Sequence, residues 1–197
     1  MNFVEIENKV VKTFMEILMD HKEDDCSLEK ISKKSKIKLS DLQSLYPFEE
    51  KTNNLIFLKI FLKNLDNNII FELQKETSKE KLTNFEIILE GIFLRFENLF
   101  PYKFAISKMS NNLNKKLINF NVLLLDNHFF MLKLLKLSGD KTNFMKLNLK
   151  ATMLNGLFVK NMNNFLNDKT ENINLIMREV DDDLKKLFEI NFIFNET

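Results

Sequence analysis

Residues 27–46 read SLEKISKKSKIKLSDLQSLY, and they determine how the first part of the chain is interpreted. Ser27 is a favourable N-cap for a short helix, because its hydroxyl can accept a hydrogen bond from a backbone N–H of the first turn. A polar turn over residues 35–38 then leads to a second short helix from about Ser40, which Pro47 ends because proline cannot continue a helix. The stretch therefore predicts two short helices joined by a tight turn.

Outside this stretch, apolar residues recur at spacings of three and four along most of the chain, which is the period of an amphipathic helix. The helices that this spacing predicts are 3–21, 53–75, 80–99, 102–112, 114–138, 143–167 and 171–192. Gly139 stands where the helix over 114–138 needs a C-terminal cap. Together with the two short helices, these segments predict an all-α fold of about nine helices, in which most Phe, Leu and Met side chains form core.

The composition excludes several other classes of protein. With 197 residues, 45% hydrophobic and 29% charged, the chain suits one medium domain or a small module fused to a larger one. Its Gly 3 and Pro 2 are too few for a hairpin-rich β fold, whose tight turns use these residues. A single cysteine, Cys26, excludes an internal disulfide framework.

The N-terminus and the apolar runs predict where the protein resides. The N-terminus carries Glu5 and Glu7 where a secretory signal peptide has basic residues. No apolar run approaches the ~18 residues that a membrane-spanning helix needs. The sequence therefore predicts a cytoplasmic protein, with a peripheral position on the inner face of the membrane left open.

No group of residues has the spacing of a catalytic or metal site. His21 and His128 are the histidines of the chain, and neither belongs to a cluster with zinc-ligand spacing. The glycines are isolated, so no glycine-rich phosphate loop is predicted. The acidic run 181–183 could hold a metal, but consecutive helix residues point in different directions, which favours a solvated acidic face. We therefore expect no enzymatic activity, no cofactor and no metal.

The net charge of +1 conceals an uneven distribution. Residues 1–60 have a net charge of −1, residues 61–100 of −2 and residues 171–197 of −4. Residues 101–170 hold 11 basic and 3 acidic side chains, a net charge of +8, interleaved with Phe, Leu and Met. Such a segment is compatible with an anionic membrane surface, an acidic protein or a nucleic acid, and equally with ordinary lysines on solvent-facing sides of helices.

The first 60 residues predict a long helix, two short helices and the turn between them, in that order. The second short helix, LSDLQSLY over 39–46, ends in the aromatic Tyr46 and holds neither Lys nor Arg. This arrangement resembles the helix-turn-helix of the TetR family of transcriptional regulators. The resemblance implies a helix-turn-helix-like module over 1–50 and a helical ligand-binding and dimerisation domain over 51–197.

Several short motifs follow one another along roughly residues 10–187. They are Leu45-Tyr46-Pro47, the segment from Leu94-Arg95 to Leu99-Phe100-Pro101-Tyr102, Ala105 and Gly139-Asp140-Lys141-Thr142, followed without a gap by Lys150, Leu154, Gly156, Phe158, Asp168, Thr170 and Arg178. Their order and spacing resemble those of the ubiquinone-biosynthesis accessory lipid-binding family. Members of that family have a TetR-like fold without a regulator's role.

The chain departs from that family at two places. The family usually has Trp-Tyr-Thr-Lys or Trp-Tyr-Thr-Arg, which carries part of its contact with a partner hydroxylase, where this chain has Leu147-Asn148-Leu149-Lys150. Better-known members also extend into an amphipathic membrane helix. In this chain, residues 187–194, which read LFEINFIF, or the basic middle would have to contact a membrane instead.

The resemblance to the lipid-binding family implies a non-enzymatic accessory protein of ubiquinone biosynthesis. It would bind an isoprenoid, a quinone-like molecule or another long apolar lipid, form a homodimer and contact a quinone-biosynthesis hydroxylase. Flexible Met and broad Phe side chains suit such a ligand. The residues that we expect to line its site follow Pro101 and are Phe104, Met109, Leu124, Phe129, Met131, Met153, Leu157 and Phe158.

The resemblance to TetR proteins implies an alternative, a DNA-binding regulator with a hydrophobic effector pocket that dimerises through its last two helices. DNA is a partner only under this alternative, through Lys34, Lys36, Lys38, Ser40, Gln43 and Tyr46. Neutralisation of phosphates by basic side chains supplies most of the non-specific affinity for DNA. Residues 1–60 have a net charge of −1, and the second short helix, which would contact the bases, holds an Asp and no basic residue. These charges favour the lipid-binding interpretation. A helical remnant with a packed core and neither ligand is the third interpretation.

Overall fold

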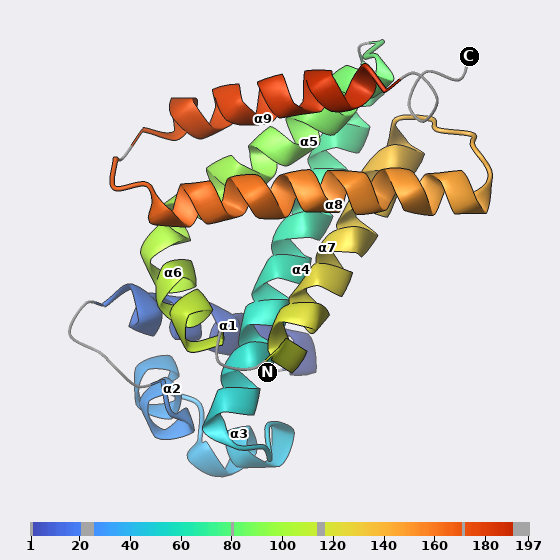
Figure 1. Cartoon of the computed structure of the whole chain (residues 1–197). Helices are drawn as coiled ribbons and strands as arrows, with labels where there is room; N and C mark the ends of the chain where they lie inside the picture. Colours follow the sequence, from blue (N-terminus) through green and yellow to red (C-terminus); the bar gives the residue numbers. More distant parts are fainter. Residues whose placement is uncertain (1, 21–25, 80, 114–116, 171, 191–197) are drawn as a thin grey trace. The chain divides into compact units, whose positions relative to one another are not determined.

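The computed structural model describes residues 2–20, 26–79, 81–113, 117–170 and 172–190 (Figure 1). These residues form helices and connecting loops, with no strand among them, so the predicted all-α class is confirmed. The helices are α1 (Phe3–Met19), α2 (Leu28–Ser35), α3 (Leu39–Leu45), α4 (Glu50–Thr77), α5 (Asn84–Leu99), α6 (Lys103–Leu113), α7 (Leu117–Leu137), α8 (Phe144–Asn167) and α9 (Ile173–Phe188). A short 3-10 helix, η1 (Phe100–Tyr102), joins α5 to α6.

The chain packs into two compact units, which we describe separately. Unit 1 consists of Met1–Asn64 and Phe104–Asn119, and unit 2 consists of Leu65–Lys103 and Phe120–Thr197. Helix α4 contributes its first part to unit 1 and its second part to unit 2. The division expected from the sequence, into a module over 1–50 and a domain over 51–197, stays a prediction.

The two short helices form in unit 1 as their sequence predicts. Ser27 is the N-cap of α2, and its hydroxyl accepts a hydrogen bond from the Lys30 N–H at 3.4 Å. The turn after α2 is tight because Lys36 takes the left-handed conformation, with a φ of 58°. The Ser32 hydroxyl donates to the carbonyl oxygen of Ile37 at 2.7 Å. Local hydrogen bonds therefore hold α2 and α3 at a fixed turn.

Aromatic side chains close the core of unit 1. Phe57 of α4 is fully buried, and its ring centroid lies 5.4 Å from that of Phe14 on α1. The Tyr46 ring, at the end of α3, meets Phe57 edge-on with centroids 4.8 Å apart. Such tilted and edge-to-face pairs are the preferred packing of aromatic rings. Phe57 therefore ties α1 and the end of α3 to α4.

In unit 2, α9 lies alongside α8 and α5 (Figure 1). The buried side chains of α9 recur every fourth residue and form one apolar face: Ile176, Val180 and Leu184. Phe96 of α5 is the centre of an aromatic cluster, with the rings of Phe158 and Phe165 at centroid distances of 5.0 and 5.5 Å. These contacts fasten α8 to α5.

Some helix boundaries differ from the prediction. Helix α5 begins at Asn84 rather than at residue 80, because the Thr83 hydroxyl accepts from the Glu86 N–H at 3.3 Å while Glu86 accepts from the Thr83 N–H at 2.7 Å. This capping box leaves the preceding residues outside the helix. Helix α4 starts at Glu50, earlier than expected, and α9 ends at Phe188 rather than at 192, although residues 191 and 192 lie outside the described part.

Polar residues interrupt the apolar runs of the longer helices. In α7, Asp126, Asn127 and His128 separate two apolar runs, and Lys133 and Lys136 follow. None of the helices in the described ranges is both long enough and apolar enough to cross a bilayer.

Candidate ligand-binding region

A buried arginine lies inside unit 2. Arg95, one of the two arginines of the chain, is on α5 and has 2% of its surface exposed. Its Nη2 donates to Asp66 Oδ2 on α4 at 3.1 Å, and its Nη1 donates to Asn127 Oδ1 on α7. Its Nε is in ionic contact with Asp66 Oδ1 at 2.8 Å, without the angle of a hydrogen bond. The planar guanidinium therefore joins α4, α5 and α7 through fixed polar contacts.

Two phenyl rings enclose the same guanidinium. The Cζ of Arg95 lies 4.5 Å from the ring centroid of Phe130 on α7 and 4.5 Å from that of Phe158 on α8. A cation over an aromatic face is attracted by the quadrupole of the ring, more strongly where water is excluded. Four helices of unit 2 therefore contribute to this centre, and one of the residues expected to line the ligand site, Phe158, belongs to it.

Burial changes the ionisation of both charged partners. It raises the pKa of Asp66 to about 6, although Arg95 and Lys133 oppose the shift. Burial also lowers the pKa of Arg95, and the charge of Asp66 opposes that shift. A guanidinium stays protonated at neutral pH, so the pair holds one cation and one largely ionised carboxylate. Because each of the two charges compensates the other, this centre holds helices α4, α5 and α7 together.

The eight residues expected to line the ligand site are divided between the two units. Phe104 and Met109 belong to α6 in unit 1, where Phe104 is exposed and Met109 is buried. The other six belong to α7 and α8 in unit 2: Leu124, Phe129, Met131, Met153, Leu157 and Phe158. The Leu124 side chain lies outside the described part of the structure.

Within unit 2, the expected lining residues range from exposed to buried. Phe129 is exposed and Met153 is half-buried, whereas Met131, Leu157 and Phe158 are buried. On each helix, the more exposed residue precedes a buried one within about one turn, Phe129 before Met131 and Met153 before Leu157. The expected lining residues therefore occupy both exposed and buried sides of α7 and α8, and Phe158 is the one that lies against Arg95.

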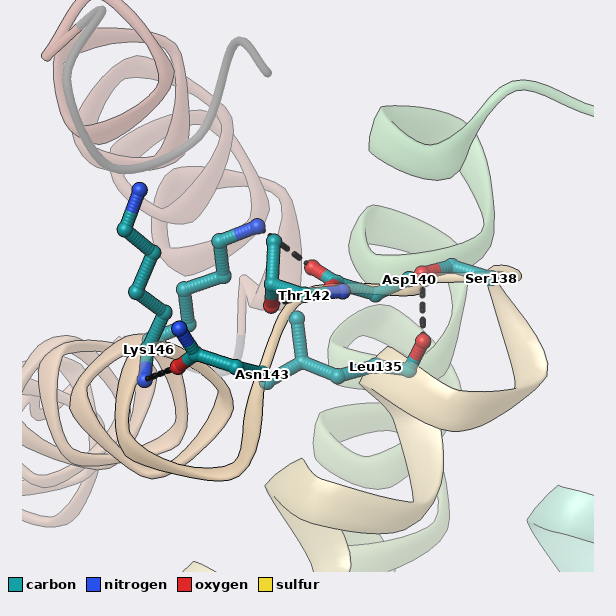
Figure 2. A network of polar contacts seen from close by, with 7 residues as sticks. Leu135, Ser138, Asp140, Thr142, Asn143 and Lys146 are labelled. Atoms are coloured by element: carbon teal, nitrogen blue, oxygen red, sulfur yellow. Dashed lines mark hydrogen bonds and ion pairs between the residues drawn. The ribbon is translucent and has the colours of Figure 1, made fainter. Parts of the chain in front are cut away.

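The loop between α7 and α8 contains the Gly139-Asp140-Lys141-Thr142 motif (Figure 2). Gly139 has a φ of 81°, and its N–H donates to the Lys136 carbonyl oxygen at 3.1 Å. The Asp140 N–H donates to the Leu135 carbonyl oxygen, also at 3.1 Å. This pair of bonds with a left-handed residue is the Schellman ending of a helix, so the predicted cap at Gly139 is confirmed.

Asp140 also ties this loop to α8. Its Oδ2 lies 2.6 Å from the Nζ of Lys150, and both side chains are buried. Its Oδ1 accepts from the Thr142 N–H at 2.9 Å, and Asn143 caps α8 by accepting from the Lys146 N–H at 3.0 Å (Figure 2). Burial raises the pKa of Asp140, but the hydrogen bonds from Lys150 and Thr142 together hold that pKa below its usual value. The motif is thus a polar joint between two helices.

The residues expected to contact DNA lie in unit 1. Five of them are exposed on or beside α2 and α3: Lys34, Lys36, Lys38, Ser40 and Gln43. Tyr46 is buried against Phe57, and burial, with a smaller contribution from Glu7, raises the pKa of its hydroxyl to about 12. Tyr46 occupies the position of the aromatic residue in the TetR pattern, and in this chain it is a core residue.

Two acidic side chains of the run 181–183 are paired with lysines. Asp183 of the acidic run accepts from Lys160 at 2.6 Å, and Asp181 pairs with Lys185 one turn away at 2.6 Å. Among the described residues, no three side chains of His, Cys, Asp or Glu come together as metal ligands would. His21 lies outside the described residues.

Comparison of the chain with known protein families and with curated proteins finds no match to either. The family resemblances therefore rest on the motifs quoted above. The structure gives several of those motifs a definite place. Arg95 lies in the interior of unit 2, and the segment from Gly139 to Thr142 joins α7 to α8.

Proposed function

We propose that this protein is a non-enzymatic binder of a long apolar lipid, of the isoprenoid or quinone type, that assists ubiquinone biosynthesis. One observation carries the proposal beyond the motifs. Phe and Met side chains of α7 and α8 supply apolar surface on the outside of unit 2, at exposed Phe129 and half-buried Met153, and in its interior, at Met131 and Phe158. A homodimer, a partner hydroxylase and a peripheral position at the membrane are further parts of the proposal, taken from the family resemblance.

The chemistry of these side chains suits such a ligand. Met is unbranched and polarisable, so it can follow an irregular apolar chain, and Phe offers broad faces to an isoprenoid. The guanidinium of Arg95 lies against Phe158, but Asp66 already compensates its charge. An uncharged lipid beside Phe158 would therefore meet no uncompensated charge, which is the condition for burying it at low cost.

Solvent extraction of the purified protein is expected to release a prenyl-quinone or another long apolar lipid, identified by mass spectrometry. Replacing the half-buried Met153 by Trp fills space where the lipid is proposed to bind. We expect Met153→Trp to lower the ratio of lipid to protein roughly threefold to tenfold, which corresponds to about 1 kcal/mol of binding free energy.

The control is Leu175→Trp, an equivalent enlargement of an exposed apolar residue on α9. It should leave the lipid content unchanged, and circular dichroism should show equal helix content in all three proteins. A wild-type protein that yields no lipid, or equal lipid in both variants, would count against the proposal.

DNA binding is the second candidate function, and one observation favours it. Lys34, Lys36 and Lys38 are exposed around the left-handed turn at Lys36, and Ser40 and Gln43 are exposed on the helix that follows. Together these residues could contact a phosphate backbone and the edges of bases. Under this candidate function the protein is a DNA-binding regulator, and the buried Tyr46 is not among the residues that contact DNA.

Binding to DNA of the protein's own promoter, measured by fluorescence anisotropy at several salt concentrations, tests this second candidate. Each neutralised phosphate adds about −0.9 to the slope of log affinity against log salt. Replacing Lys34, Lys36 and Lys38 by Ala should therefore reduce the slope by about 3. The matched control replaces three other exposed lysines of unit 1 by Ala: Lys9, Lys12 and Lys63. If the purified protein carries no lipid and its DNA binding shows this dependence on the three lysines, the lipid-binding proposal is wrong and DNA binding takes its place.

A further inference from the structure

The outer sides of α7 and α8 expose a group of apolar side chains. On α7, Leu125 and Phe129 lie one turn apart and are both more than half exposed. On α8, Phe144 and Met145 are 80% and 81% exposed, and Leu149 is 46% exposed. We call these five residues the outer apolar face. All five belong to unit 2.

A side-chain contact joins the two helices at this face. His128 Nε2 on α7 lies 3.2 Å from Asn148 Oδ1 on α8. The His128 ring lies against that of Phe129, with centroids 6.4 Å apart, and Leu149 follows Asn148 in the chain. Two residues of the outer apolar face, Phe129 on α7 and Leu149 on α8, are therefore each next in the chain to a residue of the contact between His128 and Asn148.

The charge around the face is mostly positive. Between residues 125 and 159 the chain holds five lysines and two acidic residues, Asp126 and Asp140. Asp140 forms its buried ion pair with Lys150, so these two charges cancel inside the unit. The remaining lysines of the stretch are Lys133, Lys136, Lys141 and Lys146. Lys133 donates to the neutral amide of Asn67, and Lys136 and Lys141 are exposed.

We propose, on the basis of the proposed lipid-binding function, that the outer apolar face docks the protein on an anionic lipid surface. Exposed Phe, Met and Leu side chains enter the boundary between headgroups and acyl chains, and adjacent lysines attract anionic headgroups. Phe129 belongs both to this face and to the expected lining of the ligand site. Docking here would therefore place one of the expected lining residues against the bilayer in which an isoprenoid lipid is dissolved.

A second copy of the chain fits this face less well. A symmetric dimer brings the same surface of both copies together, so two surfaces of the same net positive charge would meet. Like charges at an interface oppose association, whereas an anionic surface neutralises them. Charge complementarity therefore selects the lipid surface as the occupant.

Co-sedimentation of the full chain with vesicles tests the docking surface. The vesicles contain phosphatidylcholine alone or phosphatidylcholine with one third phosphatidylglycerol. We expect binding at least about tenfold tighter to the anionic vesicles, because each lysine near such a surface contributes favourably. The double variant Met145→Glu, Leu149→Glu should bind the anionic vesicles at least about tenfold more weakly.

The matched control is Leu175→Glu on α9, because Leu175 is 46% exposed, as is Leu149. It should bind the vesicles as the wild type does, and circular dichroism should show the same helix content in every variant. Equal binding by Met145→Glu, Leu149→Glu and the wild type would overturn the docking surface. So would vesicle binding that does not depend on phosphatidylglycerol, or a wild-type dimer that this double variant converts to monomer while vesicle binding persists.

Lipid extraction of the same preparations separates this inference from the proposed function. Lipid in the wild type without vesicle binding would overturn the docking surface and leave the lipid binder in place. Vesicle binding through α8 by a protein that carries no apolar lipid would support the docking surface and overturn the lipid binder. The double variant keeps residues 187–194, so a loss of vesicle binding identifies α8 rather than the C-terminal segment, whose residues 191–194 lie outside the described part.

Discussion

Replacing Arg95 by Met is expected to lower the free energy of unfolding by about 3–5 kcal/mol at neutral pH. The variant leaves the carboxyl of Asp66 in the interior of unit 2 without its cation, so that it must either stay charged and desolvated or take up a proton, and Asn127 loses the donor to its side-chain oxygen. Removing one partner of a buried ion pair costs more than the pair contributes, because the remaining charge is left desolvated. Two phenyl rings, those of Phe130 and Phe158, also lose the cation between them.

The effect of Arg95→Met should depend on pH with a definite sign. In the wild type the pKa of Asp66 is raised to about 6, above its value in the unfolded chain. The contribution of such a group to stability is fully present below the unfolded pKa, near 4, and is lost as the pH rises through the folded pKa. Loss of Arg95 raises the folded pKa further. The destabilisation by Arg95→Met should therefore shrink as the pH falls from 7 towards 4.

Urea unfolding followed by circular dichroism, at several pH values, measures this effect. The double variant Arg95→Met, Asp66→Leu should recover most of the lost stability, because it removes both charges. Arg178→Met is the control, since Arg178 is an exposed arginine of the same unit. A loss of less than about 1 kcal/mol in Arg95→Met would mean that water reaches Asp66, and the centre would then not be an anchor of the fold.

Local chemistry explains why much of the fold could be predicted. The N-cap at Ser27 and the glycine cap after α7 are confirmed because each depends on hydrogen bonds within a few residues of the chain. The predicted start of α5 is wrong for a related reason. Apolar spacing begins before residue 84, but the reciprocal hydrogen bonds of Thr83 and Glu86 decide where the helix starts.

The contacts that define the candidate site could not be read from local spacing. Asp66 and Asn127 lie 29 and 32 residues from Arg95 along the chain, so only the packing of three helices brings them together. One signal was present in the sequence. Arg95 is an arginine in a chain whose other basic residues are almost all lysines, and a guanidinium suits a buried two-point ion pair better than an ammonium does.

Tyr46 shows that a family pattern can give the position of a residue without giving the contacts of its side chain. Its position matches an aromatic residue of the TetR pattern, which predicted a DNA contact, but the pattern does not state which way the ring points. In unit 1 the ring packs on Phe57. The exposed Phe144 and Met145 are also instructive, because apolar spacing alone would assign such residues to a core. A periodic pattern identifies a helix more reliably than it identifies what each apolar side chain contacts.

Replacing Lys150 by Met is expected to lower the free energy of unfolding by about 2 kcal/mol at pH 7, because it leaves the buried carboxylate of Asp140 without its cation. The cost is smaller than at Arg95, since the Thr142 N–H and hydroxyl still donate to Asp140. Lys160→Met is a matched control on the same helix. Lys160 pairs with Asp183 at the same N···O distance of 2.6 Å but is 60% exposed, so its loss should cost at most about 1 kcal/mol.

The pH dependence at Asp140 should have the sign opposite to that at Asp66. The pKa of Asp140 is lowered on folding, so its contribution to stability is present above the unfolded pKa and is lost as the pH falls through the folded pKa. Lys150→Met should therefore approach the stability of the wild type in acid. Lys160→Met should show the same trend with a smaller amplitude, because Lys160 lowers the pKa of Asp183 from a more exposed position. Equal losses in the two variants at pH 7 would contradict a buried role for Lys150. The joint between α7 and α8 would then depend on the Gly139 cap, the hydrogen bonds from Thr142 to Asp140 and the contact between His128 and Asn148.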